Sequence, residues 1–227
     1  GTSYPPSNDW LETLEWIKIN TPEDSVIASW WDYGYWISTV AERTTLIDNA
    51  TLSTWQIAEV AEIFMSPPDE AWNNLQRFNA DYVVVFIVGE VFDAKYDDKP
   101  VYYLGSGGDE SKMIWFARIA EFSEQTYFEY DSSTPNNYFW NETLLGKMIP
   151  FNVATYYNGD LGQESQFYKP GFNPLFVKEI KYTDSKNDPL RLVYASPSFY
   201  NEEPGFLSGV FVYEVNKNYV PIIDTRP

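Results

Sequence analysis

Apolar residues recur every three to four positions along much of the first half of the chain, and this spacing predicts short amphipathic helices. The first helix follows a cap-forming segment, residues 7–9, and is expected to end near Asn20, before Pro22. Its apolar face is expected to carry Trp10, Leu11, Leu14, Trp16 and Ile17. The same spacing predicts further helices over residues 35–42, 53–65, 70–78 and 111–120.

Short runs rich in β-branched and aromatic residues predict strands between and after these helices. Residues 82–88 are apolar throughout, which indicates a central strand that is buried on both faces. The other predicted strands are residues 25–29 and 44–47 and, antiparallel and separated by turns, residues 176–182, 190–195 and 210–215. Loops are predicted over residues 93–108 and 131–141, and a turn at Asn158-Gly159.

The resulting fold class is α+β, with a change of pattern near residue 150. A mixed α/β core carrying helices and a few buried strands is expected over residues 4–150. A β-rich antiparallel section over residues 151–227 is expected to pack on it. With 227 residues, the chain is long enough to bury a core without disulfides or structural metals.

Composition narrows the classes of function. The formal net charge of −18 argues against nucleic acid as a partner, because a polyanion is repelled by such a surface. The chain has no Cys, hence no disulfide framework, and its longest apolar run, residues 82–89, is far shorter than the roughly 20 residues that span a bilayer. It also has no His, which excludes histidine general bases, the Ser-His-Asp triad and the commonest zinc ligand.

Aromatic residues make up 19% of the chain, an excess that has three interpretations. The rings are ordinary core, or a platform for carbohydrate, or a surface beside a membrane or partner where one end of each ring is dry and the other wet. The second interpretation gives an alternative function, a carbohydrate-binding module. A glycosidase using two carboxylates is a further alternative, but with 33 acidic residues a close pair carries almost no information.

The densest candidate site is the segment Trp30-Trp31-Asp32-Tyr33-Gly34, which leaves a predicted strand and enters a turn or a helix start. An indole N–H only donates a hydrogen bond and an ionised carboxylate only accepts one, so together they complement an alcohol. A purely structural alternative puts both Trp residues in the core and makes Asp32 a helix cap. Tyr33 and Gly34 are expected to be geometric, Gly34 allowing a turn or close packing.

This segment resembles the WWDYG signature of the catalytic subunit of oligosaccharyltransferase, the membrane enzyme of asparagine-linked glycosylation. Residues 26–29 before it and 41–51 after it also resemble that family. The family's DK motif, D-x-x-K-x-x-x-M or I, aligns with Asp109, Lys112 and Phe116, where Phe116 departs from the Met or Ile of the pattern. The resemblance covers residues 8–122 well, and the β-rich remainder only loosely.

The resemblance implies that this chain is a C-terminal globular domain that recognises the acceptor. Trp30 and Trp31 are implied to donate toward the hydroxyl of the +2 Ser or Thr in an Asn-X-Ser/Thr acceptor polypeptide, and Asp32 to accept its proton. Lys112 and Phe116 are implied to line the same pocket. Asp109 is expected either to cap the helix and orient Lys112 or to touch the peptide.

The resemblance also implies what this chain lacks. No catalytic or metal-binding residue is expected in it; the lipid-linked oligosaccharide and a divalent metal, Mn or Mg, are expected in an N-terminal transmembrane region, so this chain alone should not catalyse transfer. The implied location is the extracytoplasmic side of a membrane, and the acidic, Cys-free composition is compatible with an archaeal source. Asn49 and Asn141 begin sequons of their own and are possible glycosylation sites.

Overall fold

The structure, a computed structural model, describes residues 7–46, 54–130 and 132–222. Its helices are α1 (Asn8–Asn20), α2 (Trp31–Thr39), α3 (Thr54–Met65), α4 (Pro68–Arg77), α5 (Met113–Ile119), α6 (Asn137–Glu142) and α7 (Leu144–Met148). Short 3₁₀ turns are η1 (Asp109–Ser111), η2 (Glu124–Thr126) and η3 (Pro197–Tyr200). The mixture of helices and strands confirms the α+β class.

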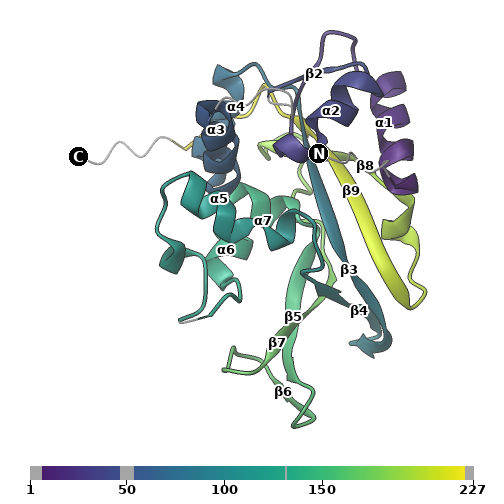
Figure 1. Cartoon of the computed structure of the whole chain (residues 1–227), viewed down its shortest axis with the longest axis vertical. Helices are drawn as coiled ribbons and strands as arrows, with labels where there is room; N and C mark the ends of the chain where they lie inside the picture. The colour runs from purple at the N-terminus through teal and green to yellow at the C-terminus, as the bar shows by residue number, and fades with distance from the viewer. Residues whose placement is uncertain (1–6, 47–53, 131, 223–227) are drawn as a thin grey trace.

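The strands form a single mixed sheet within these residues. They are β1 (Val26–Ala28), β2 (Thr44–Thr45), β3 (Tyr82–Tyr96), β4 (Lys99–Leu104), β5 (Phe151–Asn158), β6 (Gln163–Ser165), β7 (Asn173–Lys178), β8 (Leu190–Ala195) and β9 (Gly205–Val215). The order along the sheet is β2-β1-β3-β4-β7-β5-β6, and β9 pairs with both β3 and β8. In Figure 1, α3 to α7 gather on one side of the β3–β9 pair, and β5, β6 and β7 extend away from the body.

The prediction that residues 82–88 form the central strand is confirmed. β3 pairs in parallel with β1 at its start and antiparallel with β4 at its end, while β9 pairs antiparallel along residues 82–91. The predicted division at residue 150 stays a prediction. The sheet itself crosses it, because β9 is hydrogen-bonded along β3.

The predicted first helix is confirmed as α1, whose N-cap Ser7 accepts a hydrogen bond from the backbone N–H of Trp10. Its other end is closed by Arg43, which was not singled out from the sequence. The buried Arg43 guanidinium donates to the carbonyl oxygens of Lys18 and Thr21, both at 2.8 Å. An arginine therefore satisfies carbonyls that the helix end leaves without partners.

Three predictions of local structure were wrong, wholly or in part. Residues 93–108 contain the end of β3 and all of β4, a polar hairpin whose turn places Asp97 and Asp98 at φ 47° and 62°. Residues 131–141 contain most of α6, capped by Asn136, whose Oδ1 accepts from Phe139 N–H at 3.0 Å. The helix predicted over residues 35–42 begins earlier, at Trp31, soon after β1.

Candidate functional site

The candidate site occupies a gap in the hydrogen-bond ladder of β3. On one edge of this strand, β1 pairs with Tyr82 and Val83, and β4 begins to pair only at Gly89. Two side chains of η1 satisfy donors in the gap. Asp109 Oδ2 accepts from the N–H of Phe86 at 2.8 Å, and Glu110 Oε1 accepts from the N–H of Val88 at 2.9 Å. Because buried backbone donors need partners, these contacts fix η1 against the sheet.

The segment Trp30–Gly34 lies beside this gap because α2 begins where β1 ends. Trp30 is the N-cap residue, with extended backbone and no capping hydrogen bond from its side chain. Asp32 lies in the first turn of α2, where a carboxylate is stabilised by the helix dipole. Gly34 is buried inside the helix, which excludes a turn at this position and leaves close packing as its expected role. The side chain of Trp31 lies outside the described part of the structure.

Lys112 joins the two candidate segments, which are 80 residues apart in the sequence. Its Nζ donates to Asp32 Oδ2 at 3.0 Å and to the Tyr33 hydroxyl at 2.7 Å. The Tyr33 hydroxyl in turn donates to Asp109 Oδ1 at 3.0 Å. Four side chains therefore form one chain of hydrogen bonds, Asp32–Lys112–Tyr33–Asp109, that ends on the backbone of β3.

Burial shapes the electrostatics of this network. Asp109 is fully buried, and loss of solvation raises its pKa to about 6, while Lys112, the backbone N–H of Phe86 and the Tyr33 hydroxyl oppose the rise. Burial also raises the pKa of Tyr33, and the neighbouring Asp109 raises it further. Tyr33 therefore stays a neutral phenol that relays hydrogen bonds between a cation and a carboxylate.

Only one end of the network is open to a ligand. The side chain of Asp32 is 37% exposed and that of Lys112 is 22% exposed, whereas Asp109 is closed off. Asp32 and Lys112 thus present an acceptor and a donor side by side. The expectation that Asp109 orients Lys112 agrees with this geometry. Asp109 does not cap α5, because the N-cap position of that helix is Lys112.

Trp30 and Phe116 form an aromatic layer beneath this exposed end. Their ring centroids are 4.6 Å apart at an interplanar angle of 60°, and Phe116 also packs on Phe64 at 5.5 Å. Phe116 is fully buried and Trp30 is almost so. Phe116 therefore contacts the Trp30 ring from within the core.

Of the two sequons in this chain, the structure describes only the one that begins at Asn141. Asn49 lies outside the described residues. Asn141 is exposed in α6, but Thr143 of the same sequon is fully buried, donates to Phe139 O at 2.7 Å and accepts from Gly146 N–H at 2.9 Å as the N-cap of α7. In the folded chain the Thr143 hydroxyl is therefore committed to capping.

Sequence reasoning named Tyr33 among the acceptor-binding residues with a geometric role, and the structure adds that its hydroxyl is the centre of the network. It missed one participant. Glu110 was not singled out, although it fills the ladder gap beside Asp109. The only signal available was the adjacent pair of acids before Lys112, which by itself means little in a chain with 33 acidic residues.

The arrangement of strands and helices has a counterpart among solved structures. The chain is similar to the C-terminal globular domain of oligosaccharyltransferase from Archaeoglobus fulgidus, with a TM-score of 0.50 and 21% identity, over 94% of this chain and 100% of the other. At this level of identity the likeness shows a shared fold.

The sequence comparisons give a partial match to one family model and matches to two longer relatives. Residues 22–103 match the family model described as the STT3/PglB/AglB core domain, a span that includes residues 30–34 and ends before Asp109. The dolichyl-diphosphooligosaccharide–protein glycosyltransferase subunit STT3 of Saccharomyces cerevisiae is 31% identical over 189 residues, which is 78% of this chain and 24% of that protein. Subunit stt3 of Schizosaccharomyces pombe is 34% identical over 155 residues, 62% of this chain and 18% of that protein.

This chain thus spans a quarter or less of the length of these relatives. Across residues 7–46, 54–130 and 132–222, no helix has both the length and the apolar character needed to cross a bilayer.

Proposed function

We propose that this chain is the acceptor-recognition domain of an oligosaccharyltransferase and binds the +2 Ser or Thr of an Asn-X-Ser/Thr sequon. The observation that carries the proposal is the chain of hydrogen bonds Asp32–Lys112–Tyr33–Asp109, which joins the two segments that resemble family motifs. The family model and the glycosyltransferase relatives support the same role.

The chemistry of recognition follows from the exposed end of the network. Asp32 accepts a hydrogen bond from the acceptor hydroxyl group. The indole N–H groups of Trp30 and Trp31 donate hydrogen bonds to the oxygen of that hydroxyl. Lys112 Nζ, 3.0 Å from Asp32 Oδ2, holds the Asp32 carboxylate in place. An acceptor with Ala at +2 offers no hydroxyl to the Asp32 carboxylate and so lacks one hydrogen bond to a charged group, which is worth about 1.5–3 kcal/mol.

The Thr methyl group contributes less than the hydroxyl. Burying one methyl gains about 0.8 kcal/mol, roughly a fourfold effect at most. The fully buried Phe116 stands where the resembled motif has Met or Ile, and its ring packs against that of Trp30. We therefore expect strong rejection of Ala at +2 and only a weak preference between Thr and Ser.

The remaining parts of the reaction are assigned to the rest of the proposed enzyme. An N-terminal transmembrane region is proposed to bind the lipid-linked oligosaccharide and the divalent metal, and to place this domain on the extracytoplasmic side. Among the described residues, no group of three or more Asp or Glu side chains is arranged to hold a metal ion. We also propose an archaeal source for the chain, although the two relatives named above are from yeasts.

The test is equilibrium binding of two acceptor peptides to the complete enzyme, identical except for Thr or Ala at +2. The expected result is at least about a tenfold weaker affinity for the Ala peptide, lost when Asp32→Asn removes the acceptor charge. A matched control is Asp24→Asn, an exposed acid outside the network. Equal affinities of the unmodified enzyme for the two peptides would show the proposal to be wrong.

A further inference from the structure

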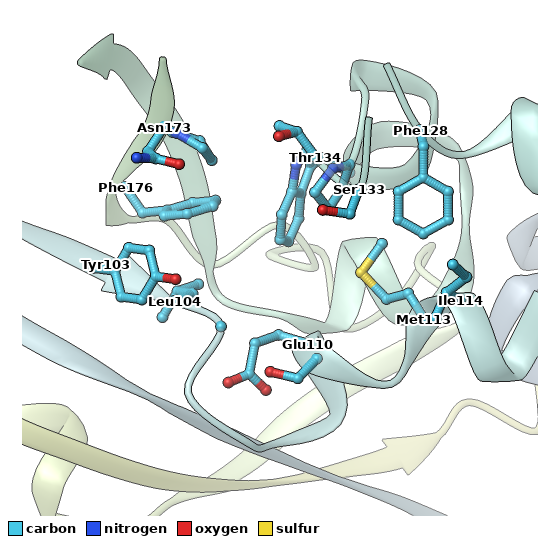
Figure 2. A pocket seen from close by; sticks show the side chains of 15 residues that line it. Tyr103, Leu104, Glu110, Met113, Ile114, Phe128, Ser133, Thr134, Asn173 and Phe176 are labelled. Carbon is cyan, nitrogen blue, oxygen red and sulfur yellow. The ribbon is translucent and has the colours of Figure 1, made fainter. Parts of the chain in front are cut away.

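A second candidate site borders η1 and the start of α5. A cavity of about 300 Å³ is enclosed by the end of β4, the start of β7, the start of α5 and the segment before α6. Figure 2 shows Tyr103 on one wall, Phe128 on the facing wall, Thr134 above and Glu110 at the base. Trp30, Asp32 and Lys112 are absent from its lining, so it is separate from the acceptor site.

The lining combines aromatic rings with uncharged polar groups. Tyr103 and Phe128 are half-buried and lie on opposite sides of the cavity. Trp140 and Phe176 also line it and pack on each other, with ring centroids 5.1 Å apart. Hydroxyl and amide groups stand around the opening, contributed by Ser111, Ser133, Thr134 and Asn173. The lining residues, all within the described part of the chain, include no Lys or Arg.

Two buried polar atoms of lining residues are left without partners within the described residues. They are Glu110 Oε2 and the indole nitrogen Trp140 Nε1, an acceptor and a donor. Glu110 is 7% exposed, and its other oxygen already accepts from the N–H groups of Val88 and Gly108. Native proteins rarely leave such groups unpaired, and both atoms belong to residues in the cavity wall while having almost no accessible surface of their own.

The lining excludes several classes of ligand. An anion meets no cation among these lining residues and faces Glu110 in a chain of net charge −18. A purely apolar occupant would cover the hydroxyl and amide groups without satisfying them. A cation gains little from Glu110, because two backbone N–H groups already compensate that carboxylate. The remaining class has apolar ring faces and a hydroxyl-rich edge.

We infer that this cavity binds one or two neutral pyranose rings of an oligosaccharide. Tyr103 and Phe128 stack on the C–H faces of the sugar, and Asn173 and Thr134 bond its hydroxyl groups. The volume lies at the lower end of the roughly 300–1,000 Å³ typical of small-molecule pockets, which suits a mono- or disaccharide. The inference is independent of the acceptor role, because it rests on other residues.

The test is a titration of the ¹⁵N-labelled 227-residue chain, followed by NMR. The probes are N-acetylglucosamine, N,N′-diacetylchitobiose, mannose and mannobiose, with tetramethylammonium and an aromatic peptide as competitors from other classes. At least one sugar is expected to bind in the roughly millimolar range or tighter, shifting the Trp140 indole signal and the backbone signals of Tyr103 and Asn173.

Single substitutions distinguish sugar binding in this cavity from non-specific binding elsewhere on the chain. Tyr103→Ala is expected to weaken sugar binding about tenfold through loss of stacking. Asn173→Ala, at an exposed position, is expected to weaken it severalfold with the spectrum of the folded chain preserved. Trp115→Ala removes an equally aromatic but exposed ring outside the cavity and is expected to leave binding unchanged.

Three results would overturn sugar binding in this cavity. They are no signal shifts with any of the four sugars, binding of only tetramethylammonium or the peptide, and sugar-induced shifts that persist in both Tyr103→Ala and Asn173→Ala. Asp32→Asn is expected to leave sugar binding intact. Failure here leaves acceptor recognition standing, because the peptide test uses different residues.

Discussion

Asp109 and Glu110 are neighbours in η1 and both fill the gap in β3, yet they face different surroundings. Both oxygens of Asp109 are hydrogen-bonded, to Phe86 N–H and the Tyr33 hydroxyl, and Lys112 Nζ lies 3.9 Å away. Glu110 bonds through one oxygen only and borders a cavity with no basic side chain among its described lining residues. Burial accordingly raises the pKa of Asp109 to about 6 and that of Glu110 to about 7.

The difference shows how one short turn supports two kinds of surface. On the side of α2, a nearby cation and full hydrogen bonding make a rigid network with a fixed exposed end. On the cavity side, Glu110 keeps one buried oxygen without a hydrogen-bond partner among the described residues. The following changes in η1 and its contacts test whether the two sides are distinct.

The largest effect is expected from Asp109→Ala. This change leaves the N–H of Phe86 and the hydroxyl of Tyr33 unpaired and removes an anion from Lys112. The free energy of unfolding should fall by about 3–5 kcal/mol, as measured by urea denaturation. Asp109→Asn keeps the size of the side chain and one hydrogen-bond acceptor, so it should lower the free energy of unfolding clearly less. Equal, small effects of both changes would mean that the network does not hold η1.

Glu110→Gln is expected to raise the free energy of unfolding at pH 8 but not at pH 4.5. The folded state holds the Glu110 proton up to about pH 7, while the unfolded state releases it near 4.5. Stability contributed by this group therefore falls as pH rises between these values. The substituted amide keeps an oxygen that accepts from Val88 and lacks the buried charge, so the variant should gain about 1–3 kcal/mol at pH 8 and nothing at pH 4.5.

The control for this pH effect is Glu12→Gln, an exposed acid on α1. It should leave the difference in unfolding free energy between pH 4.5 and pH 8 as in the unmodified chain. A stabilisation by Glu110→Gln that is independent of pH would contradict the buried ionised carboxylate.

Tyr33→Phe should have an intermediate effect. It removes the hydroxyl between Lys112 and Asp109 while keeping the ring that packs on Trp10 at 4.8 Å. A loss of about 1–2 kcal/mol in unfolding free energy is expected from the unpaired buried groups. Because Tyr33 positions Lys112, transfer to a Thr acceptor should also lose selectivity over Ala. Lost stability with unchanged selectivity would restrict Tyr33 to a structural role.

Phe116→Met should produce the smallest change. Met is one of the two residues of the DK pattern that this position resembles, and it fills the buried space against Trp30 with a flexible side chain. The ratio of Thr to Ser transfer should change by less than about fivefold, because a single methyl contact is involved. A larger change, measured by competition between the two acceptors, would indicate direct contact between residue 116 and the acceptor.

Elements with strong local patterns could be predicted from the sequence. The strand over residues 190–195 has the predicted bounds, and the capped first helix and the apolar central strand also agree. The hairpin over residues 93–104 was missed because its residues are polar and its turn uses Asp97 and Asp98 instead of the usual glycine. α7 has only five residues, too few to show a period.

The candidate site was predictable only where motif residues carry it. The proximity of Asp32 and Lys112 was expected from the family resemblance, and the structure brings them to 3.0 Å. The bonds from Asp109 and Glu110 to the backbone of β3 were not predictable, because a side chain that fills a gap in a ladder leaves no periodic signal. The cavity beside Glu110 was missed because its lining residues come from separate stretches of the chain and share no sequence pattern.

The most direct test of the acceptor role is a double-mutant cycle between Asp32 of the complete enzyme and the +2 residue of the acceptor. The four combinations are unmodified enzyme or Asp32→Asn with a Thr or a Val acceptor, compared by kcat/KM. Val matches Thr in shape and lacks the hydroxyl. We predict a coupling free energy of about 2 kcal/mol, roughly thirtyfold in kcat/KM, from the hydrogen bond between the hydroxyl and the Asp32 carboxylate. A coupling near zero, with both changes simply additive, would contradict recognition of the acceptor hydroxyl by Asp32.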